Sequence, residues 1–477
     1  MKMKTKIILA ITISLIVNLF YAQNNCRCSD ALEKLITKIE NEYPGFEQKT
    51  KDKVLYDGFK KQLEDNAGNA TSENCIEILK KYTSFFRDGH IWINSSIGKK
   101  EQQIRGSDFV KIDISKFQKS IKPTAKGLEG IWKSKFVETG GLVYDIGITK
   151  KNSTEYTGFI TSSSSKFWKP NEVKFRLFPN GKYEYYALDK SLKTGNYDVY
   201  DNSIIYFREM RVFLVKENPK TKLLEEQVKV KVGELRGFEI KQLTDKTTII
   251  TLPSFDYPYV EIIKDLIDKN LSLLEGSKNL IVDLRGNSGG TDTAYYNLLP
   301  YIMTGSTRSL GVEYLATNTL INGLSGYIES VKGREDKKDE IEMLNKDIAL
   351  LKSNMGKFVN LSGKPFSVNK FDISNKSPEH VAVLVDKRVG SAAENFVMAT
   401  RQSKKVKIIG TVTSGGLDYA AARFFDFGCP EYQLQLPTFR SLRLPDYPVD
   451  NIGLQPDLYL DKNVEDWIQY TVGYLEQ

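Results

Sequence analysis

The stretch VAVLVDKRVGSAAENFVMAT (residues 381–400) joins an apolar run to a helix-like segment through a charged, glycine-containing turn. Val381–Val385 has the length and composition of a buried strand, and a strand–turn–helix unit of this kind is typical of α/β folds. Ser391 stands where the helix begins. It is either an ordinary helix N-cap, or a hydroxyl projected from the sheet beside backbone N–H groups that can stabilise an oxyanion.

A second junction of this type is NLIVDLRGNSGG (residues 279–290), in which a hydrophobic strand ends in a glycine-rich loop. Gly289 and Gly290 allow the backbone to approach a ligand closely, so the loop can supply an N–H donor to an oxyanion. The alternative is a tight strand-to-helix turn. A phosphate loop is disfavoured because the Lys-Ser/Thr ending is missing. Ser288 is a rival nucleophile, but no base motif accompanies it.

Strands alternate with helices throughout residues 237–477. TTIITL and VKIIGTV are strand-like, and YVEIIKDLIDKNLSLL is helical. This alternation predicts an α/β core with at least partly parallel strands. The pattern breaks over residues 310–375, which we interpret as an insertion. A charged amphipathic helix at about residues 337–355 either covers the site or is a solvated excursion.

Two further regions precede this core. Residues 23–100 show the three-and-four spacing of amphipathic helices, which predicts an N-terminal helical domain. Residues 127–225 contain short alternating segments rich in aromatic and β-branched residues, separated by turns, which predict a small β-barrel or sandwich.

The first 22 residues have a basic start, a short apolar run and a small residue, Ala22, at a plausible cleavage point. These features predict a signal peptide and an exported bacterial protein, either periplasmic or secreted, with no membrane-spanning segment after its removal.

Export permits disulfides, and the chain has four cysteines. Cys26 and Cys28 are too close to bridge each other comfortably. We expect one or both to form a disulfide that ties down the mature N-terminus, with Cys75 as the favoured partner. The fourth cysteine is Cys429, and the full pairing stays open. A metal site is weakly supported, because the chain has only two histidines.

The net charge of +8 comes from lysines scattered among acids. That distribution is typical of a solvated surface and not of nucleic-acid binding. No cofactor is expected. The oligomeric state is not determined by the sequence.

A serine nucleophile needs a base. His380 opens a buried-type strand, where a structural role is the simpler interpretation. His90 lies in FFRDGHIWI (residues 85–93), in a glycine turn between a helix and a strand, where a base is accessible.

Four motifs follow one another along the chain: DLRGNSGG, VAVLVDKRVGSAAENF, IIGTVTSGG and NIGLQPDLYL. Together with FFRDGHIWI they resemble the tail-specific (C-terminal processing) and tricorn-like family of serine peptidases. The resemblance covers roughly residues 237–460. It implies a crotonase-like α/β core, with Ser391 as the nucleophile.

Two catalytic styles occur in that family. The tail-specific branch uses a lysine after T-x-G, and here Gly416 holds that position. The tricorn-like branch uses a histidine from an upstream D-[GA]-H motif, which Asp88-Gly89-His90 matches. The acid of the tricorn-like branch lies three residues before the glycine of a G-x-x-P-D motif. In this chain that position is Asp450, where a glutamate is commoner in the family.

The resemblance therefore implies an exported serine endopeptidase acting on peptides or proteins. Ser391 attacks the peptide carbonyl, His90 moves the proton, and Asp450 orients His90 directly or through a neighbour. Ala392 with Gly289 or Gly290 forms the oxyanion hole. Glu394 braces the turn.

One alternative is a catalytically inactive protein that binds a ligand or partner on the same scaffold, as vertebrate retinoid carriers do. Another is a glycan-associated surface protein that acts through the β-rich region. That region shows no Gly-loop of a PDZ domain, so recognition of free C-termini is not predicted.

Overall fold

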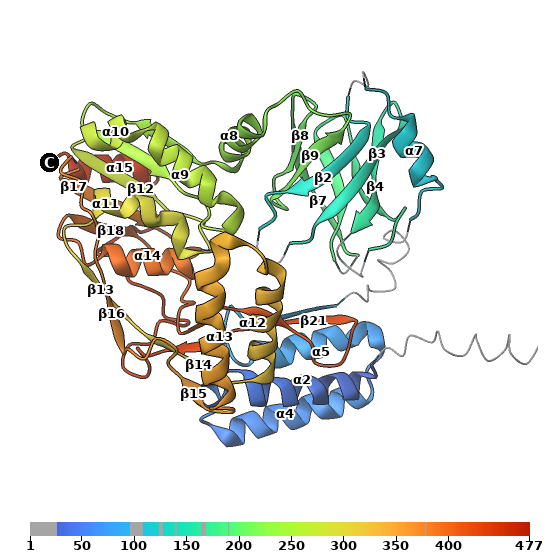
Figure 1. The fold of residues 1–477 in the computed structure, drawn as a ribbon, viewed down its shortest axis with the longest axis horizontal. Helices are drawn as coiled ribbons and strands as arrows, with labels where there is room; N and C mark the ends of the chain where they lie inside the picture. Colours follow the sequence, from blue (N-terminus) through green and yellow to red (C-terminus); the bar gives the residue numbers. More distant parts are fainter. Residues whose placement is uncertain are drawn as a thin grey trace, which may run out of the picture.

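The computed structural model describes residues 26–95, 108–123, 127–138, 141–163, 168–188, 190–376 and 378–477. The signal peptide predicted for residues 1–22 lies outside these residues. Helices and a closed barrel accompany a mixed α/β core, as the sequence predicts (Figure 1). None of the described helices is long and apolar enough to span a membrane.

The N-terminal region is helical. Its elements are α2 (Cys28–Glu42), α3 (Phe46–Lys49), α4 (Lys53–Gly68), α5 (Ser72–Ser84) and the strand β1 (Trp92–Ser95). Its hydrophobic core is shared with residues 419–436, from which Leu434 and Leu436 pack against the helices. β1 pairs antiparallel with β21 (Tyr432–Leu436), which in turn pairs with β20 (Arg423–Phe425). The N-terminal region and residues 423–436 therefore pack as one unit.

The middle region is a closed antiparallel barrel of eight strands in which each strand pairs with the next and β9 returns to β2. The strands are β2 (Gly130–Lys135), β3 (Tyr144–Asn152), β4 (Glu155–Ser163), β5 (Val173–Leu177), β6 (Lys182–Tyr186), β7 (Leu192–Tyr200), β8 (Ile204–Phe207) and β9 (Val212–Asn218), and α7 (Ile114–Ser120) precedes them. Buried aromatic side chains such as Trp132, Phe175 and Phe207 fill the interior. Closure removes the exposed edges that an open sheet would present.

The core is a six-stranded sheet in the order β10-β11-β12-β17-β18-β23. All neighbours are parallel except β10 and β11, so the prediction of partly parallel pairing is confirmed. The strands are β10 (Glu239–Gln242), β11 (Thr247–Thr251), β12 (Asn279–Asp283), β17 (His380–Val385), β18 (Val406–Gly410) and β23 (Leu458–Tyr459). β12 and β17 are buried along almost their whole length, as expected for a sheet covered on both faces.

Helices cover both faces of this sheet. One face packs against α9 (Val260–Lys269), η2 (Asp292–Leu298) and α14 (Ala392–Thr400), and the other against α15 (Trp467–Leu475). Further short elements on the chain are α8 (Glu225–Arg236), η1 (Tyr257–Tyr259), α10 (Leu271–Gly276), α11 (Leu299–Ile302), β19 (Tyr419–Ala420) and β22 (Phe439–Ser441). Whether this core is crotonase-like stays a prediction.

The predicted insertion contains two strand pairings and a helical hairpin. Its elements are β13 (Thr307–Leu310), β14 (Val312–Leu315), α12 (Asn318–Val331), η3 (Glu335–Lys337), α13 (Lys338–Lys352), β15 (Phe358–Val359) and β16 (Phe366–Asn369). α13 matches the helix predicted at about residues 337–355. It packs on α12 through a small core of its own that includes Leu324, Ile348 and Leu351.

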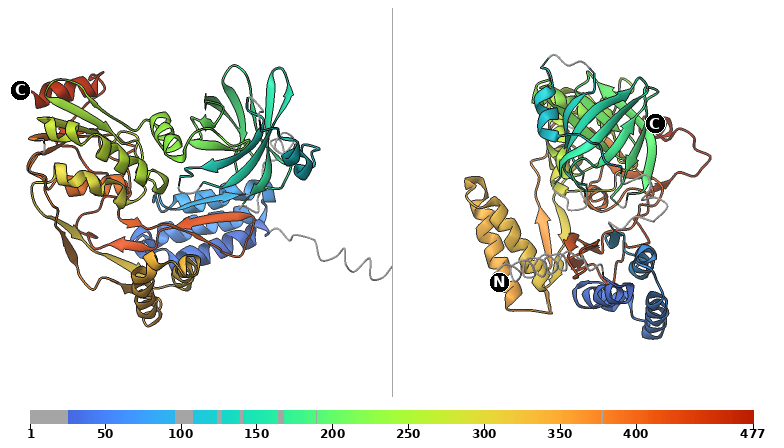
Figure 2. Two further views of the ribbon diagram at one scale, coloured as in Figure 1. Left: turned by 45° about the horizontal axis from the view of Figure 1, so that its top comes forward. Right: turned by 90° about the vertical axis from the view of Figure 1, so that its right-hand side faces the viewer.

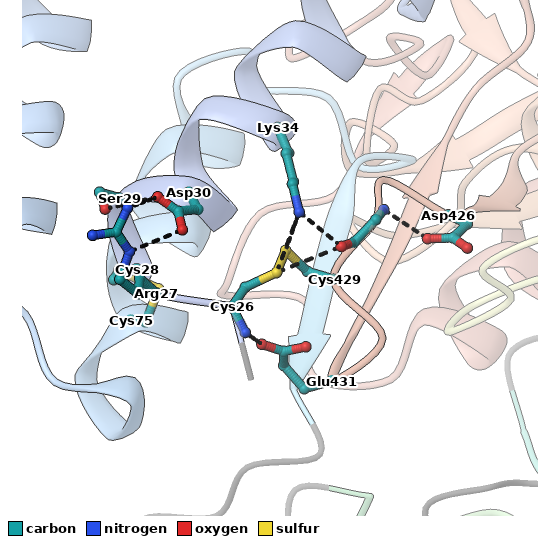
Figure 3. The surroundings of a disulfide bond; sticks show 11 residues. Cys26, Arg27, Cys28, Ser29, Asp30, Lys34, Cys75, Asp426, Cys429 and Glu431 are labelled. Carbon is teal, nitrogen blue, oxygen red and sulfur yellow. Dashed lines mark hydrogen bonds and ion pairs between the residues drawn. A yellow bond between two sulfur atoms is a disulfide. The ribbon is translucent and has the colours of Figure 1, made fainter. Parts of the chain in front are cut away.

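Two disulfides fasten the N-terminus (Figure 3). Cys28 bridges Cys75 between α2 and α5, so the expected use of Cys75 is confirmed. Cys26 bridges Cys429, which lies 403 positions away in the turn before β21. Lys34 strengthens the same junction by donating to the Gly428 carbonyl at 3.0 Å. The N-terminal helices are thus covalently fixed to the strand that pairs with β1.

Candidate active site

Ser391 lies at the junction between β17 and α14 with φ +52° and ψ −123°. A non-glycine residue in this region is strained, and such strain persists where the surrounding structure enforces it. The turn is enforced from both sides, because Gly390 N–H donates to Asn287 O and Ser414 N–H donates to Val389 O. The hydroxyl therefore stands at the start of α14, outside the strand.

His90 reaches this serine from the N-terminal region. It follows α5 in the Asp88-Gly89 turn and precedes β1, whose pairing with β21 fixes the direction of the chain. The His90 carbonyl also accepts a bond from Gln435 Nε2 at 3.3 Å. The ring Nε2 lies 3.4 Å from Ser391 Oγ. A distance of this size suits a base and nucleophile pair that tightens when substrate binds.

The carboxylate in contact with the His90 ring is Asp88. Its Oδ1 lies 3.7 Å from Nδ1 and accepts the backbone N–H of His90 at 2.8 Å. Tyr43 Oη donates to the other oxygen at 2.9 Å. Burial opposes the charged imidazolium, but the adjacent carboxylate of Asp88, helped by the charges of Asp450 and Glu394, raises the pKa of His90 above its ordinary 6.5.

Asp450, the acid expected from the motif, lies nearby without touching the ring. Its Oδ1 accepts the backbone N–H groups of Leu417 and Asp418 at 3.1 and 2.9 Å, and Oδ2 lies 3.4 Å from Lys49 Nζ. Burial and the charge of Asp88 raise the pKa of Asp450 to about 6. Its influence on His90 is therefore through charge, not through a hydrogen bond.

Glu394 is completely buried and accepts four hydrogen bonds. Ser391 N–H and Gly416 N–H bind Oε2 at 3.1 and 2.9 Å. Gly415 N–H binds Oε1 at 2.9 Å, and the Thr413 hydroxyl binds the same oxygen. With four donors the carboxylate is fixed in one orientation, and both of its oxygens are already engaged. The geometry agrees with the expected bracing role.

The candidate oxyanion donors differ in availability. Ala392 N–H has no acceptor among the described residues. Gly289 N–H donates to Asn287 Oδ1 at 2.9 Å, so this donor is already engaged. The bridge to Phe255 uses the flanking Gly289 carbonyl and Thr291 N–H, which leaves Gly290 N–H outside it. Ala392 and Gly290 are therefore the better pair.

Gly289 serves the site in another way. A Cβ atom at Gly289 would lie 2.8 Å from Ala392 N and 2.8 Å from Ser391 Cβ. Any side chain there would collide with the serine turn, and φ is +99°. The glycine keeps this space clear.

Gly416 replaces the lysine of the tail-specific style. A Cβ atom built on it would lie 3.7 Å from His90 Cε1 and 3.9 Å from Glu394 Oε2. The imidazole of His90 thus lies beside the position from which a lysine would extend.

Ser391 opens onto a cleft of about 1110 Å³. The insertion contributes its strands β13 and β16 to the wall, but α12 and α13 do not line it. Apolar and polar side chains alternate around the cleft, including Tyr295, Met398, Leu417, Lys370 and Arg443. Its volume suits an extended peptide better than a small cofactor.

The family assignment agrees with this geometry: residues 246–460 match the family model described as peptidase family S41. This part of the chain is therefore similar to peptidase family S41. Peptidases of this family act on peptide or protein substrates. The matched residues include Ser391 and Asp450. They do not include His90, which lies before them in the N-terminal region.

Several solved structures are similar to this chain. Mature CPAF is 11% identical, with coverage of 91% of this chain and 92% of its own and a TM-score of 0.46. A putative peptidase from Parabacteroides merdae is 13% identical, with coverage of 95% and 98% and a TM-score of 0.43. The photosystem II D1 C-terminal processing protease is 10% identical, with coverage of 93% and 96% and a TM-score of 0.37. No curated protein sequence matches the chain.

Sequence reasoning missed three residues of this site. Asp88 was part of the histidine motif but had no role of its own. Thr413 bridges Glu394 to the Leu454 N–H. Arg443 is buried between Leu417 O and Asp418, at 2.8 and 3.4 Å. The D-G-H spacing carried a signal for Asp88 and the T-x-G motif carried one for Thr413, whereas Arg443 had none. No group of three metal-ligating side chains occurs among the described residues.

Proposed function

We propose that the chain is an exported serine endopeptidase of the tricorn-like branch, with Ser391 as nucleophile and His90 as general base. One observation carries the proposal: a serine held at positive φ at a helix start lies 3.4 Å from a histidine that is 301 positions away. A serine that served only as a helix N-cap would not need a base within reach of its hydroxyl.

The reaction begins when Ser391 Oγ attacks the peptide carbonyl and its proton passes to His90 Nε2. The carbonyl oxygen becomes negative and accepts hydrogen bonds from Ala392 N–H and Gly290 N–H. The imidazolium then gives its proton to the leaving amine as the C–N bond breaks. Water attacks the resulting ester by the same route and releases the acyl fragment.

The acid function is divided between two carboxylates. Asp88 contacts the His90 ring and stabilises the imidazolium that forms. Asp450, which the motif predicted, supports it at longer range through charge. Gly89, Ala392 and Glu394 shape the two turns without taking part in proton transfer.

Export is supported by the two disulfides, which form and persist in oxidising compartments. We place the protein in the periplasm or outside the cell. The crotonase-like description of the core is part of the same proposal.

Labelling with a fluorophosphonate probe tests the mechanism. We expect wild type to label and both Ser391→Ala and His90→Ala to lose labelling. Ser288→Ala is the matched control, because that serine lies in the neighbouring loop, and it should label normally. Folded wild type that stays unlabelled would refute an activated serine and would favour the inactive ligand-binding alternative.

A further inference from the structure

The barrel contains a second cavity, of about 290 Å³, that shares no lining residue with the Ser391 cleft. Its walls come from the end of β2, the start of β3, the end of β6 and the start of β9, so it occupies one end of the barrel. Figure 2 shows this barrel beside the N-terminal helices and β21. Eight-stranded barrels are just wide enough to hold one small ligand.

A lysine lies at the base of this cavity. Lys174 is 1% exposed, and its ammonium donates to the Tyr186 carbonyl at 2.6 Å. The ammonium also lies over three rings, 3.8 Å from the centroid of Trp168, 4.5 Å from Tyr185 and 4.7 Å from Tyr144. The aromatic faces stabilise the cation where water is excluded.

Two phenol hydroxyls beside the ammonium have no hydrogen-bond partner among the described residues. Tyr144 and Tyr185 are 6% and 4% exposed and line the cavity, yet neither hydroxyl bonds any described residue. Burial raises the pKa of each, so both hydroxyls are donors at neutral pH. Because both residues line the cavity, their hydroxyls are available to donate to an acceptor bound there.

The remaining wall is mixed: Lys135, Glu138 and Arg211 contribute charged groups, and an apolar part is made by Leu142, Leu188, Met210, Val212 and Phe213. An acceptor bound at the two hydroxyls can therefore place an apolar body against these five side chains. We propose that the barrel binds a small amphipathic carboxylate, whose oxygens accept hydrogen bonds from Tyr144 and Tyr185 beside the Lys174 ammonium while its apolar part fills the space toward Leu188 and Val212.

The rim of this cavity is shared with the catalytic region. Asn94 on β1 and Gln433 on β21 line it and are paired with each other in the strand register. His90 precedes β1 by two residues. A bound ligand would therefore contact the same strand pair that fixes the histidine, although binding itself does not depend on catalysis.

Titration calorimetry with octanoate on the full-length mature protein tests the proposal. We expect saturable binding of octanoate and much weaker binding of octan-1-ol, which has the same chain but no charge. Tyr144→Phe and Tyr185→Phe should each weaken octanoate binding about tenfold, because each removes one hydrogen bond to a charged acceptor. Both changes keep the ring and its packing.

Tyr183→Phe is the matched control. Its hydroxyl bonds Glu209 at 3.2 Å and it does not line the cavity, so octanoate affinity should be unchanged. Equal binding of octanoate and octan-1-ol, or no binding of either, would overturn the proposal. Ser391→Ala should bind octanoate as wild type does, so a failure of the proposed peptidase activity would be distinguishable from a failure of this site.

Discussion

At the residue scale, the contact between Asp88 and His90 decides when the candidate base is active. Only the neutral imidazole can accept the Ser391 proton. The pKa of His90 is raised above 6.5 by Asp88 in spite of burial. The rate of serine labelling should therefore rise with pH, with a midpoint above 6.5.

Asp88→Asn should move that midpoint to lower pH, since it removes the negative charge while Asn can still accept the His90 backbone N–H. It should also slow labelling at high pH, because the imidazolium loses its partner. Rates of fluorophosphonate labelling across pH measure both effects. Asp245→Asn, at an exposed site in the turn before β11, is the control. An unchanged midpoint in Asp88→Asn would contradict the assignment.

At the scale of elements, the helical hairpin α12–α13 is separable from the site. It has its own small core and does not line the cleft. Its ends are adjacent, because Ala316 N–H donates to Lys357 O at 3.0 Å and Gly356 N–H donates to Ala316 O at 2.8 Å. The solvated interpretation of the predicted helix therefore agrees better with the geometry than a cover over Ser391.

Replacing residues 318–354 with a short Gly-Ser linker should leave the rate of serine labelling within about twofold of wild type, because no catalytic contact is lost and short flexible linkers close such gaps at small cost. Some stability should be lost, since Val359 becomes exposed. Near-complete loss of labelling in a folded variant would show that the hairpin shapes the site. Circular dichroism establishes folding.

At the scale of the whole molecule, the candidate site depends on the attachment of the N-terminal region to residues 423–436. The Cys26–Cys429 bridge, the shared hydrophobic core and the β1–β21 pairing all act at this junction. Movement of the N-terminal helices would carry His90 away from Ser391 while both segments stayed folded.

Cys26→Ser with Cys429→Ser should lower the free energy of unfolding by about 2–4 kcal/mol, as loss of a native disulfide commonly does. Labelling should also be lost at a lower denaturant concentration than in wild type. Comparing oxidised wild type with the double variant, each also after reduction, separates loss of Cys26–Cys429 from loss of Cys28–Cys75 and from other effects of the substitutions. Identical midpoints for loss of labelling would mean that the bridge does not hold the site together.

Local pattern was enough to predict much of this protein. Strand–turn–helix junctions at Ser391 and Gly289, the amphipathic helices and the alternating barrel strands depend on hydrophobic periodicity and turn chemistry, which are properties of neighbouring residues. The alternation of strands and helices likewise determined that the core is α/β. His90 was found because a glycine turn next to a helix end is itself a local signal.

Only the tertiary structure decided which distant groups meet. Asp88 and not Asp450 contacts the His90 ring, while Asp450 accepts the backbone N–H groups of Leu417 and Asp418. The pairing of Cys26 with Cys429 also depends on the tertiary structure. So does the position of the Lys174 ammonium over three aromatic rings in the closed barrel. The Cys26–Cys429 bridge joins residues 403 positions apart, and the approach of His90 to Ser391 spans 301, so these distances are set by the packing of whole elements rather than by any local preference.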